Sequence, residues 1–202
     1  MQPTAAVHLD GVFVPDSDVV GPVGEGFRAV ALRALDGGRV NIGACSVGGA
    51  QGALNAAARY SRERRQFGAR VADFQATRFR LADALTDVEA SRLLVRRAAA
   101  ALDRVAAAAK DGATPAEEDA DEASALAAMA KRFASDRCFD AANASLQTFG
   151  GYGYLRDYGV ERIVRDLRVH SLLEGTNEVM RLVVAKKAPL FVRAAAADGG
   201  SV

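Results

Sequence analysis

The stretch from Phe74 to Val95, FQATRFRLADALTDVEASRLLV, carries the clearest fold signal in the sequence. Its large apolar residues recur at spacings of 7, 4, 3 and 7 positions, at Phe74, Leu81, Leu85, Val88 and Val95. This spacing places them on one face of an α-helix. The stretch therefore predicts a long helix that buries a continuous apolar stripe.

Helical patterns occupy most of the remaining chain. We expect further helices over about 27–36, 39–64, 122–149, 160–169 and 176–192, with a break or kink at Gly37-Gly38 and a solvated acidic loop over 110–122. Many small residues over 39–64, such as Gly43 and Gly49, predict close packing against another helix or a ligand. Because no βαβ alternation is visible, the fold class is mainly α, an antiparallel helical bundle.

The first part of the chain follows a different pattern. Residues 7–23 alternate between apolar and polar and are interrupted by turn pairs such as Asp10-Gly11 and Gly21-Pro22. This pattern predicts short strand pieces. Such a fragment is too small to fold alone and must pack on the rest of the chain or on a partner. We therefore divide the chain into a β fragment, 1–23, and a helical bundle domain, 24–202.

Composition narrows the class of function. The chain has 202 residues, half of them apolar, and its 26 basic side chains almost balance 25 acidic ones. Such a chain can bury one sizeable core but has no net field to hold nucleic acid or an anionic membrane surface. Two histidines and two cysteines stand at no metal-ligand spacing, so we expect no zinc site. We expect Cys45 and Cys138 to be small core residues in a reducing compartment, and the protein to be cytosolic without a membrane span.

Five short motifs stand out in order along the chain. They are Leu35-Asp36-Gly37-Gly38-Arg39, Glu63-Arg64-Arg65-Gln66-Phe67-Gly68, Gln147-Thr148-Phe149-Gly150-Gly151-Tyr152-Gly153-Tyr154, Arg165-Asp166 and Leu173-Glu174-Gly175-Thr176-Asn177-Glu178. Each has an ordinary structural interpretation when taken alone. The glycines from Gly150 to Gly153, for example, follow a helix rather than a strand and fit a dinucleotide fingerprint poorly.

Together, in this order and at these separations, the motifs resemble the acyl-CoA dehydrogenase family. The resemblance runs from the family's late middle-domain strands, here 1–23, through its C-terminal helical domain. It implies FAD as cofactor, an acyl-CoA substrate, an electron-transfer flavoprotein as acceptor, and a homo-oligomer that is a dimer of dimers. An acyl-CoA oxidase, which passes electrons to oxygen, is the alternative enzyme.

The resemblance also implies a set of FAD-binding residues. They are Arg64, Arg65, Gln66, Phe67, Phe74, Gln75, Gln147, Gly150, Gly151, Thr176, Asn177 and Glu178. In the family, the arginine matching Arg64 grips the flavin pyrophosphate across a dimer interface, which suits a guanidinium fork. The first turn of the last helix favours an anion through its dipole.

Glu174 matches the family's general base, the carboxylate that removes the substrate α-proton while a β-hydride passes to flavin N5. Some relatives carry this base just before the position of Arg39, but here that residue is Gly38, which cannot titrate. Gly175, Asp36 and Arg39 match positions near the acyl-CoA thioester. The resemblance therefore leaves Glu174 as the candidate base.

Two classes of function stay open. In the first, the chain is the catalytic-base half of a dehydrogenase, completed by a separate chain or belonging to a larger parent. The stretch Gly153-Tyr154-Leu155-Arg156-Asp157-Tyr158 is among those that resemble family members acting on short 2-methyl-branched acyl-CoAs such as isobutyryl-CoA. In the second, the chain is a non-catalytic module that uses the bundle for oligomerisation or interaction.

Overall fold

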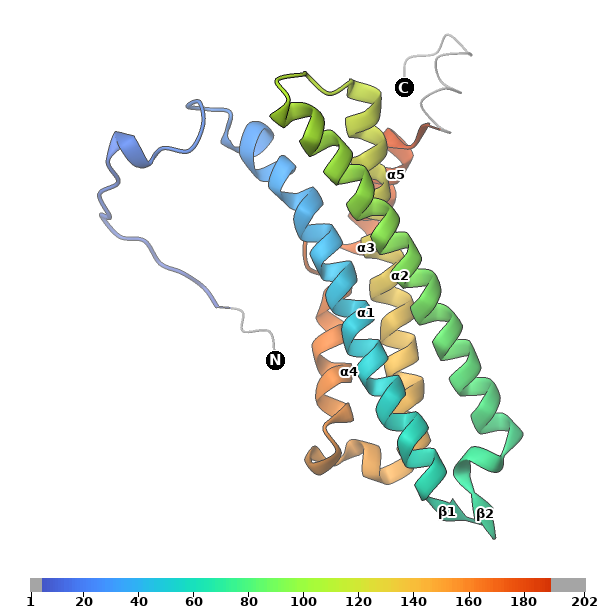
Figure 1. The fold of residues 1–202 in the computed structure, drawn as a ribbon. Helices are drawn as coiled ribbons and strands as arrows, with labels where there is room; N and C mark the ends of the chain where they lie inside the picture. Colours follow the sequence, from blue (N-terminus) through green and yellow to red (C-terminus); the bar gives the residue numbers. More distant parts are fainter. Residues whose placement is uncertain (1–4, 190–202) are drawn as a thin grey trace.

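Three long helices run antiparallel along the length of the molecule (Figure 1). The computed structural model describes residues 5–189. Its helices are α1 (Leu32–Glu63), α2 (Gln75–Lys110), α3 (Glu117–Phe149), α4 (Val160–Arg168) and α5 (Asn177–Lys187), and a π-helical segment, Gly26–Ala31, leads into α1. The predicted mainly α bundle is confirmed. None of the described helices is both long and apolar enough to cross a membrane.

Helix α3 is the centre of the bundle. It packs against α1, α2, α4 and α5, and every residue from Ala123 to Ala128 is buried. This segment consists mainly of alanine, which lets neighbouring helices approach closely on all sides. A helix covered all round needs no single apolar stripe, so its sequence pattern is weaker than that of α2.

Glycines in α1 mark two close helix contacts. A Cβ atom added to Gly43 would lie 2.8 Å from Cγ2 of Val95 on α2, and one added to Gly49 would lie 2.9 Å from Cδ2 of Leu167 on α4. Both distances are shorter than packed carbon atoms tolerate. The close packing predicted for this helix is therefore confirmed at these two positions.

Three predicted boundaries were wrong. Helix α1 runs through Gly37-Gly38 without a break, because the surrounding helices hold its backbone. Helix α3 begins at Glu117 instead of near residue 122, and its first turn holds three acidic residues, which the helix dipole stabilises. Helix α5 ends at Lys187, and the rest of the predicted helix beyond 189 lies outside the described residues.

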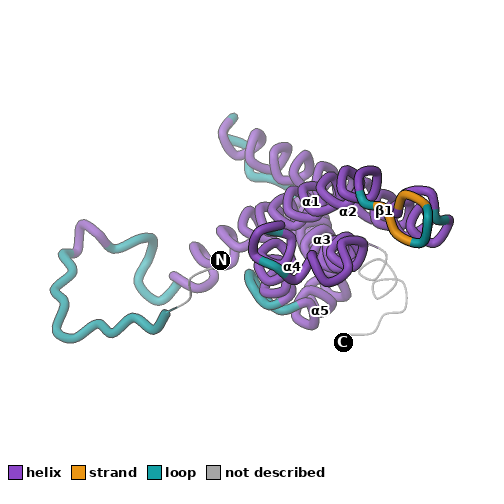
Figure 2. The backbone as a smooth tube through the Cα atoms, turned by 90° about the horizontal axis from the view of Figure 1, so that it is seen from below, coloured by secondary structure: helices purple, strands orange, loops and turns teal. Residues whose placement is uncertain are grey.

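The predicted strand pieces over 7–23 were also wrong. Residues 5–25 contain no strand and lie beside the bundle rather than on it (Figures 1 and 2), with Phe13 and Val23 exposed by 86% and 93%. Alternation favours an extended chain, but a strand also needs a hydrogen-bonding neighbour. The one strand pair in residues 5–189 is a hairpin of β1 (Arg65–Gln66) and β2 (Ala69–Arg70). The division into two domains stays a prediction.

The two cysteines lie in different environments. Cys138 on α3 is buried, as expected for a core residue, and burial raises the pKa of its thiol to about 11. Cys45 is exposed, so its predicted place in the core was wrong. Its neighbours Ser46 and Val47 are buried, which places Cys45 on the outer face of α1.

Candidate functional site

A tight turn between α4 and α5 holds Glu174. The chain leaves α4 through a short 3-10 segment, Val169–Ser171, and then places Glu174 and Gly175 at φ angles of 56° and 90°. A left-handed conformation costs a residue with a side chain roughly 1–2 kcal/mol. The surrounding contacts must therefore hold Glu174 in this conformation.

The Glu174 carboxylate lies directly against Gly38 of α1. A Cβ atom at Gly38 would lie 2.7 Å from Cδ of Glu174 and would overlap its Oε2. The missing side chain at Gly38 therefore creates the space that the carboxylate fills. Two positions that the sequence singled out, 136 residues apart, meet here.

Arg39, which is buried, forms an ion pair beside this turn with Asp36, which is partly buried. The Arg39 Nη1 atom donates to Oδ1 of Asp36 over 2.6 Å, and its Nε donates to the carbonyl oxygen of Glu174 over 3.5 Å. Ser124 Oγ also donates to Oδ1 of Asp36, over 3.1 Å. Arg39 is only 6% exposed, so in this chain its guanidinium supports the turn. A direct contact of Asp36 and Arg39 with substrate stays a prediction.

Lys131 reaches the same turn from α3. Its side chain is fully buried, and Nζ donates to the carbonyl oxygen of Gly175 over 2.7 Å and to Oδ1 of Asn177 over 2.9 Å. Burial lowers the pKa of Lys131 to about 8, against the opposing attraction of Asp136. None of the motifs found in the sequence includes this residue. Its signal was a lysine that directly follows an alanine-rich, mainly apolar stretch, residues 123–130.

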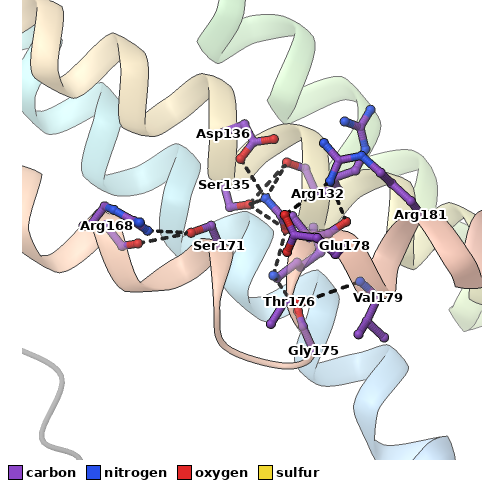
Figure 3. Close-up of polar contacts among 12 residues, drawn as sticks. Arg132, Ser135, Asp136, Arg168, Ser171, Gly175, Thr176, Glu178, Val179 and Arg181 are labelled. Carbon is purple, nitrogen blue, oxygen red and sulfur yellow. Dashed lines mark hydrogen bonds and ion pairs between the residues drawn. The ribbon is translucent and has the colours of Figure 1, made fainter.

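The start of α5 is tied to α3 by Asn177. Its amide nitrogen donates to Oδ1 of Asp136 over 2.7 Å and to Oγ of Ser135 over 2.9 Å, and Figure 3 shows both partners on α3 facing the start of α5. Thr176 caps the helix by accepting from the N–H of Val179. Asn177 is 4% exposed, so its side chain is committed to packing, and only its backbone is left to contact a ligand.

A second cluster lines a groove of about 830 Å³ where the hairpin meets the end of α3. Seven of the predicted cofactor residues line it: Arg64, Gln66, Phe67, Phe74, Gln147, Gly150 and Gly151. The Arg64 guanidinium lies 5.0 Å from the centre of the Tyr152 ring, and Arg80 adds a second positive charge to the lining. Arginine side chains suit the phosphates of a nucleotide, and aromatic rings suit its base.

The remaining predicted cofactor residues lie elsewhere. Arg65 and Gln75 are exposed and do not line the groove. Thr176, Asn177 and Glu178 lie at the start of α5, next to the Glu174 turn. Gly38 and Arg64 are 26 residues apart along α1, which at 1.5 Å per residue is about 39 Å. The structure therefore places the other ten predicted cofactor residues in two separate clusters.

Comparison with known proteins identifies the family to which this fold belongs. The acyl-CoA dehydrogenase C-terminal domain matches residues 24–188. The chain belongs to the acyl-CoA dehydrogenase family. It is 48% identical over 186 residues to a mitochondrial isobutyryl-CoA dehydrogenase of Dictyostelium discoideum, covering 92% of this chain and 41% of that protein.

Two other members of the family are informative. The caffeyl-CoA reductase–Etf complex subunit CarC of Acetobacterium woodii is 40% identical, over 90% of this chain and 44% of that protein. The solved structure of butyryl-CoA dehydrogenase from Megasphaera elsdenii superposes with a TM-score of 0.73 at 38% identity, over 86% of this chain and 41% of that one. The chain thus spans less than half the length of these relatives.

Proposed function

We propose that this chain supplies the general base and part of the cofactor site of an FAD-dependent acyl-CoA dehydrogenase. The observation that supports this best is the Glu174 carboxylate, held against Gly38 in a left-handed turn. A proton acceptor must be fixed beside the carbon it deprotonates, and contacts from α1 and α3 hold the turn that carries this carboxylate.

The reaction requires the Glu174 carboxylate to accept a proton from the α-carbon of a bound acyl-CoA thioester. The residues present also fit FAD, since the groove combines Arg64 and Arg80 with aromatic rings, and nothing lies within 4 Å of a Cβ added to Gly150 or Gly151. FAD, when bound, would supply the acceptor for the hydride that leaves the β-carbon. Arg64 would hold its phosphates, and the backbone at the start of α5 of a second chain would lie near its other end.

The separation of the two clusters supports a site shared between chains. A distance of about 39 Å along α1 is longer than a flavin dinucleotide, so one cofactor cannot touch both clusters of one chain. In a two-fold dimer, the groove of one chain can serve the turn of its partner. A dimer of dimers is the assembly that we expect from the family.

Similarity supports the finer assignments of substrate and acceptor. The substrate we propose is a short 2-methyl-branched acyl-CoA such as isobutyryl-CoA, because a relative of that name shares 48% identity. The acceptor we propose is an electron-transfer flavoprotein, since the Acetobacterium relative belongs to a complex with Etf. A substrate panel in which butyryl-CoA is clearly preferred would contradict the first assignment. The cytosolic location stays a prediction, which cell fractionation would test.

The decisive experiment replaces the proton acceptor. The chain should be co-expressed with the preceding region of the Dictyostelium relative, purified with FAD, and mixed anaerobically with isobutyryl-CoA. Flavin bleaching should be fast in the unmodified complex. In Glu174→Gln it should be about 100 to 10,000 times slower, because the amide keeps the shape of the side chain but accepts no proton.

The matched control is Glu178→Gln. Glu178 is an exposed carboxylate at the start of α5, close in sequence but outside the turn, so this change should affect flavin retention more than the bleaching rate. A Glu174→Gln complex that retains FAD and bleaches at the unmodified rate would remove Glu174 from its role. An unmodified complex that binds FAD and acyl-CoA without bleaching would favour a non-catalytic module.

A further inference from the structure

Buried cations hold both carbonyl groups of the Glu174 turn. The carbonyl of Glu174 accepts from Arg39 on α1, and the carbonyl of Gly175 accepts from Lys131 on α3. Arg39 is 6% exposed and Lys131 is fully buried. Hydrogen bonds from charged donors in a site of low dielectric are stronger than neutral ones. The two left-handed residues are therefore held from two helices at once.

These bonds also set the direction of the backbone amides. In a planar trans peptide the C=O and the following N–H point in opposite directions. The N–H of Gly175 therefore points away from Arg39, and the N–H of Thr176 points away from Lys131. Neither amide donates a hydrogen bond within residues 5–189. The turn thus presents free donors next to a fixed carboxylate.

Lys131 is itself fixed on a second side. Its other acceptor, Oδ1 of Asn177, belongs to a side chain whose nitrogen donates to Oγ of Ser135 and to Oδ1 of Asp136. Among the described residues, Lys131 forms no ion pair with a carboxylate within 4.0 Å. An unpaired buried charge is unfavourable for stability. A lysine kept here for simple charge neutralisation would have a carboxylate partner, whereas Lys131 has two neutral oxygens at well-defined positions.

We propose that Lys131 is a positioning residue for the proton transfer. Its bond to the Gly175 carbonyl holds the turn so that the Glu174 carboxylate stays against Gly38 and the free amides face the substrate side. Lys131 acts through the turn and touches no reacting atom. This assignment rests on the proposed role of Glu174 as the base.

The kinetic test is a double-variant cycle in the completed, FAD-loaded complex. Lys131→Met removes the donor but keeps a long side chain, and it should slow flavin bleaching by about 10 to 100-fold, because a misplacement of about 1 Å costs that much. In a Glu174→Gln background, Lys131→Met should slow bleaching no further. Equal slowing in both backgrounds would overturn the proposal, since a general structural defect does not depend on the base.

A matched control and a second variant keep the result interpretable. Lys187→Met removes another lysine that joins α5 to α3, through an ion pair with Asp121 of 2.9 Å, but leaves the turn untouched. It should bleach flavin at the unmodified rate. Where Lys131→Met fails to fold, Lys131→Gln gives the same comparison, since its shorter amide cannot reach both acceptors.

A structural test separates this proposal from the role of Glu174. In the 202-residue chain itself, an NMR cross-peak between Gly38 Hα and Glu174 Hγ shows that the Glu174 side chain packs against α1. The cross-peak should be present in the unmodified chain and in Lys187→Met, and lost in Lys131→Met. Its persistence in Lys131→Met would overturn the positioning role. If Glu174→Gln alone leaves bleaching unchanged, the proposed function fails, and this measurement still decides whether Lys131 holds the turn.

Discussion

At the scale of single residues, Gly38 and Glu174 depend on each other. Replacing Gly38 with alanine should push the carboxylate away from α1, because the new Cβ would lie 2.7 Å from Cδ of Glu174. We expect bleaching in the completed complex to slow by about 10 to 100-fold. The control is Gly37→Ala, where nothing lies within 4 Å of the new Cβ. That variant should keep its rate and gain up to about 1 kcal/mol in helix stability. Equal rates for both variants would contradict the packing argument.

Lys131 should also give the folded chain a specific pH dependence. Its pKa is about 8 in the folded state, against an ordinary 10.5, so between these pH values the unfolded chain binds more protons. Stability should therefore rise with pH across this window by about 1 to 3 kcal/mol, while below it the cost of the buried charge is constant and adds no pH dependence. Urea unfolding from pH 7 to 10.5 measures this change. The unmodified chain should show a steeper rise than Lys131→Met, and parallel curves would contradict the shifted pKa.

Only some of these residues could be predicted from the sequence. Glu174 and Gly38 could be predicted because the family motifs contain them. Their contact could not, because it joins a helix to a turn far along the chain. The burial of Lys131 could not be predicted, because lysine in a helix is usually solvated and only the helices packed around α3 bury this one.

At the scale of elements, helix existence was predictable and helix ends were less so. The stripe from Phe74 to Val95 predicted most of α2, since a one-sided helix shows its period directly. The stripe is not buried throughout, however, because Leu85 is 48% exposed and Ala84 takes its place in the core. The first turn of α3 resembled a solvated loop because its acidic residues interact with the helix dipole and not with the core. In segment 7–23 the error was the opposite one, since strands were predicted where none form. Alternation of apolar and polar residues favours an extended chain, but it does not show whether a neighbouring strand is present to form hydrogen bonds. The hairpin turn at Phe67-Gly68, with φ angles of 51° and 80°, was missed because glycine there also fits a helix cap.

At the scale of the whole molecule, the two clusters imply a shared site. The groove around Arg64 and the turn of Glu174 lie about 39 Å apart along α1. Residues 5–25 expose large apolar side chains such as Val7 and Phe13, by 80% and 86%. Such surface is usually covered by another part of a protein or by a partner. We therefore expect the completed complex to self-associate, and a clean monomer in light scattering at micromolar concentration would contradict this.

Mixing two defective chains tests the shared site directly. Arg64→Ala and Glu174→Gln should each inactivate the completed complex when present alone, the first by loss of flavin and the second by loss of the base. When both chains are co-expressed in equal amounts, half of the two-fold dimers should contain one chain of each kind. If each site takes Arg64 from one chain and Glu174 from the other, each mixed dimer has one site with both defects and one intact site. The preparation should then recover about a quarter of the unmodified bleaching amplitude. If both residues served the same chain's site, every site would carry one defect and no activity would return.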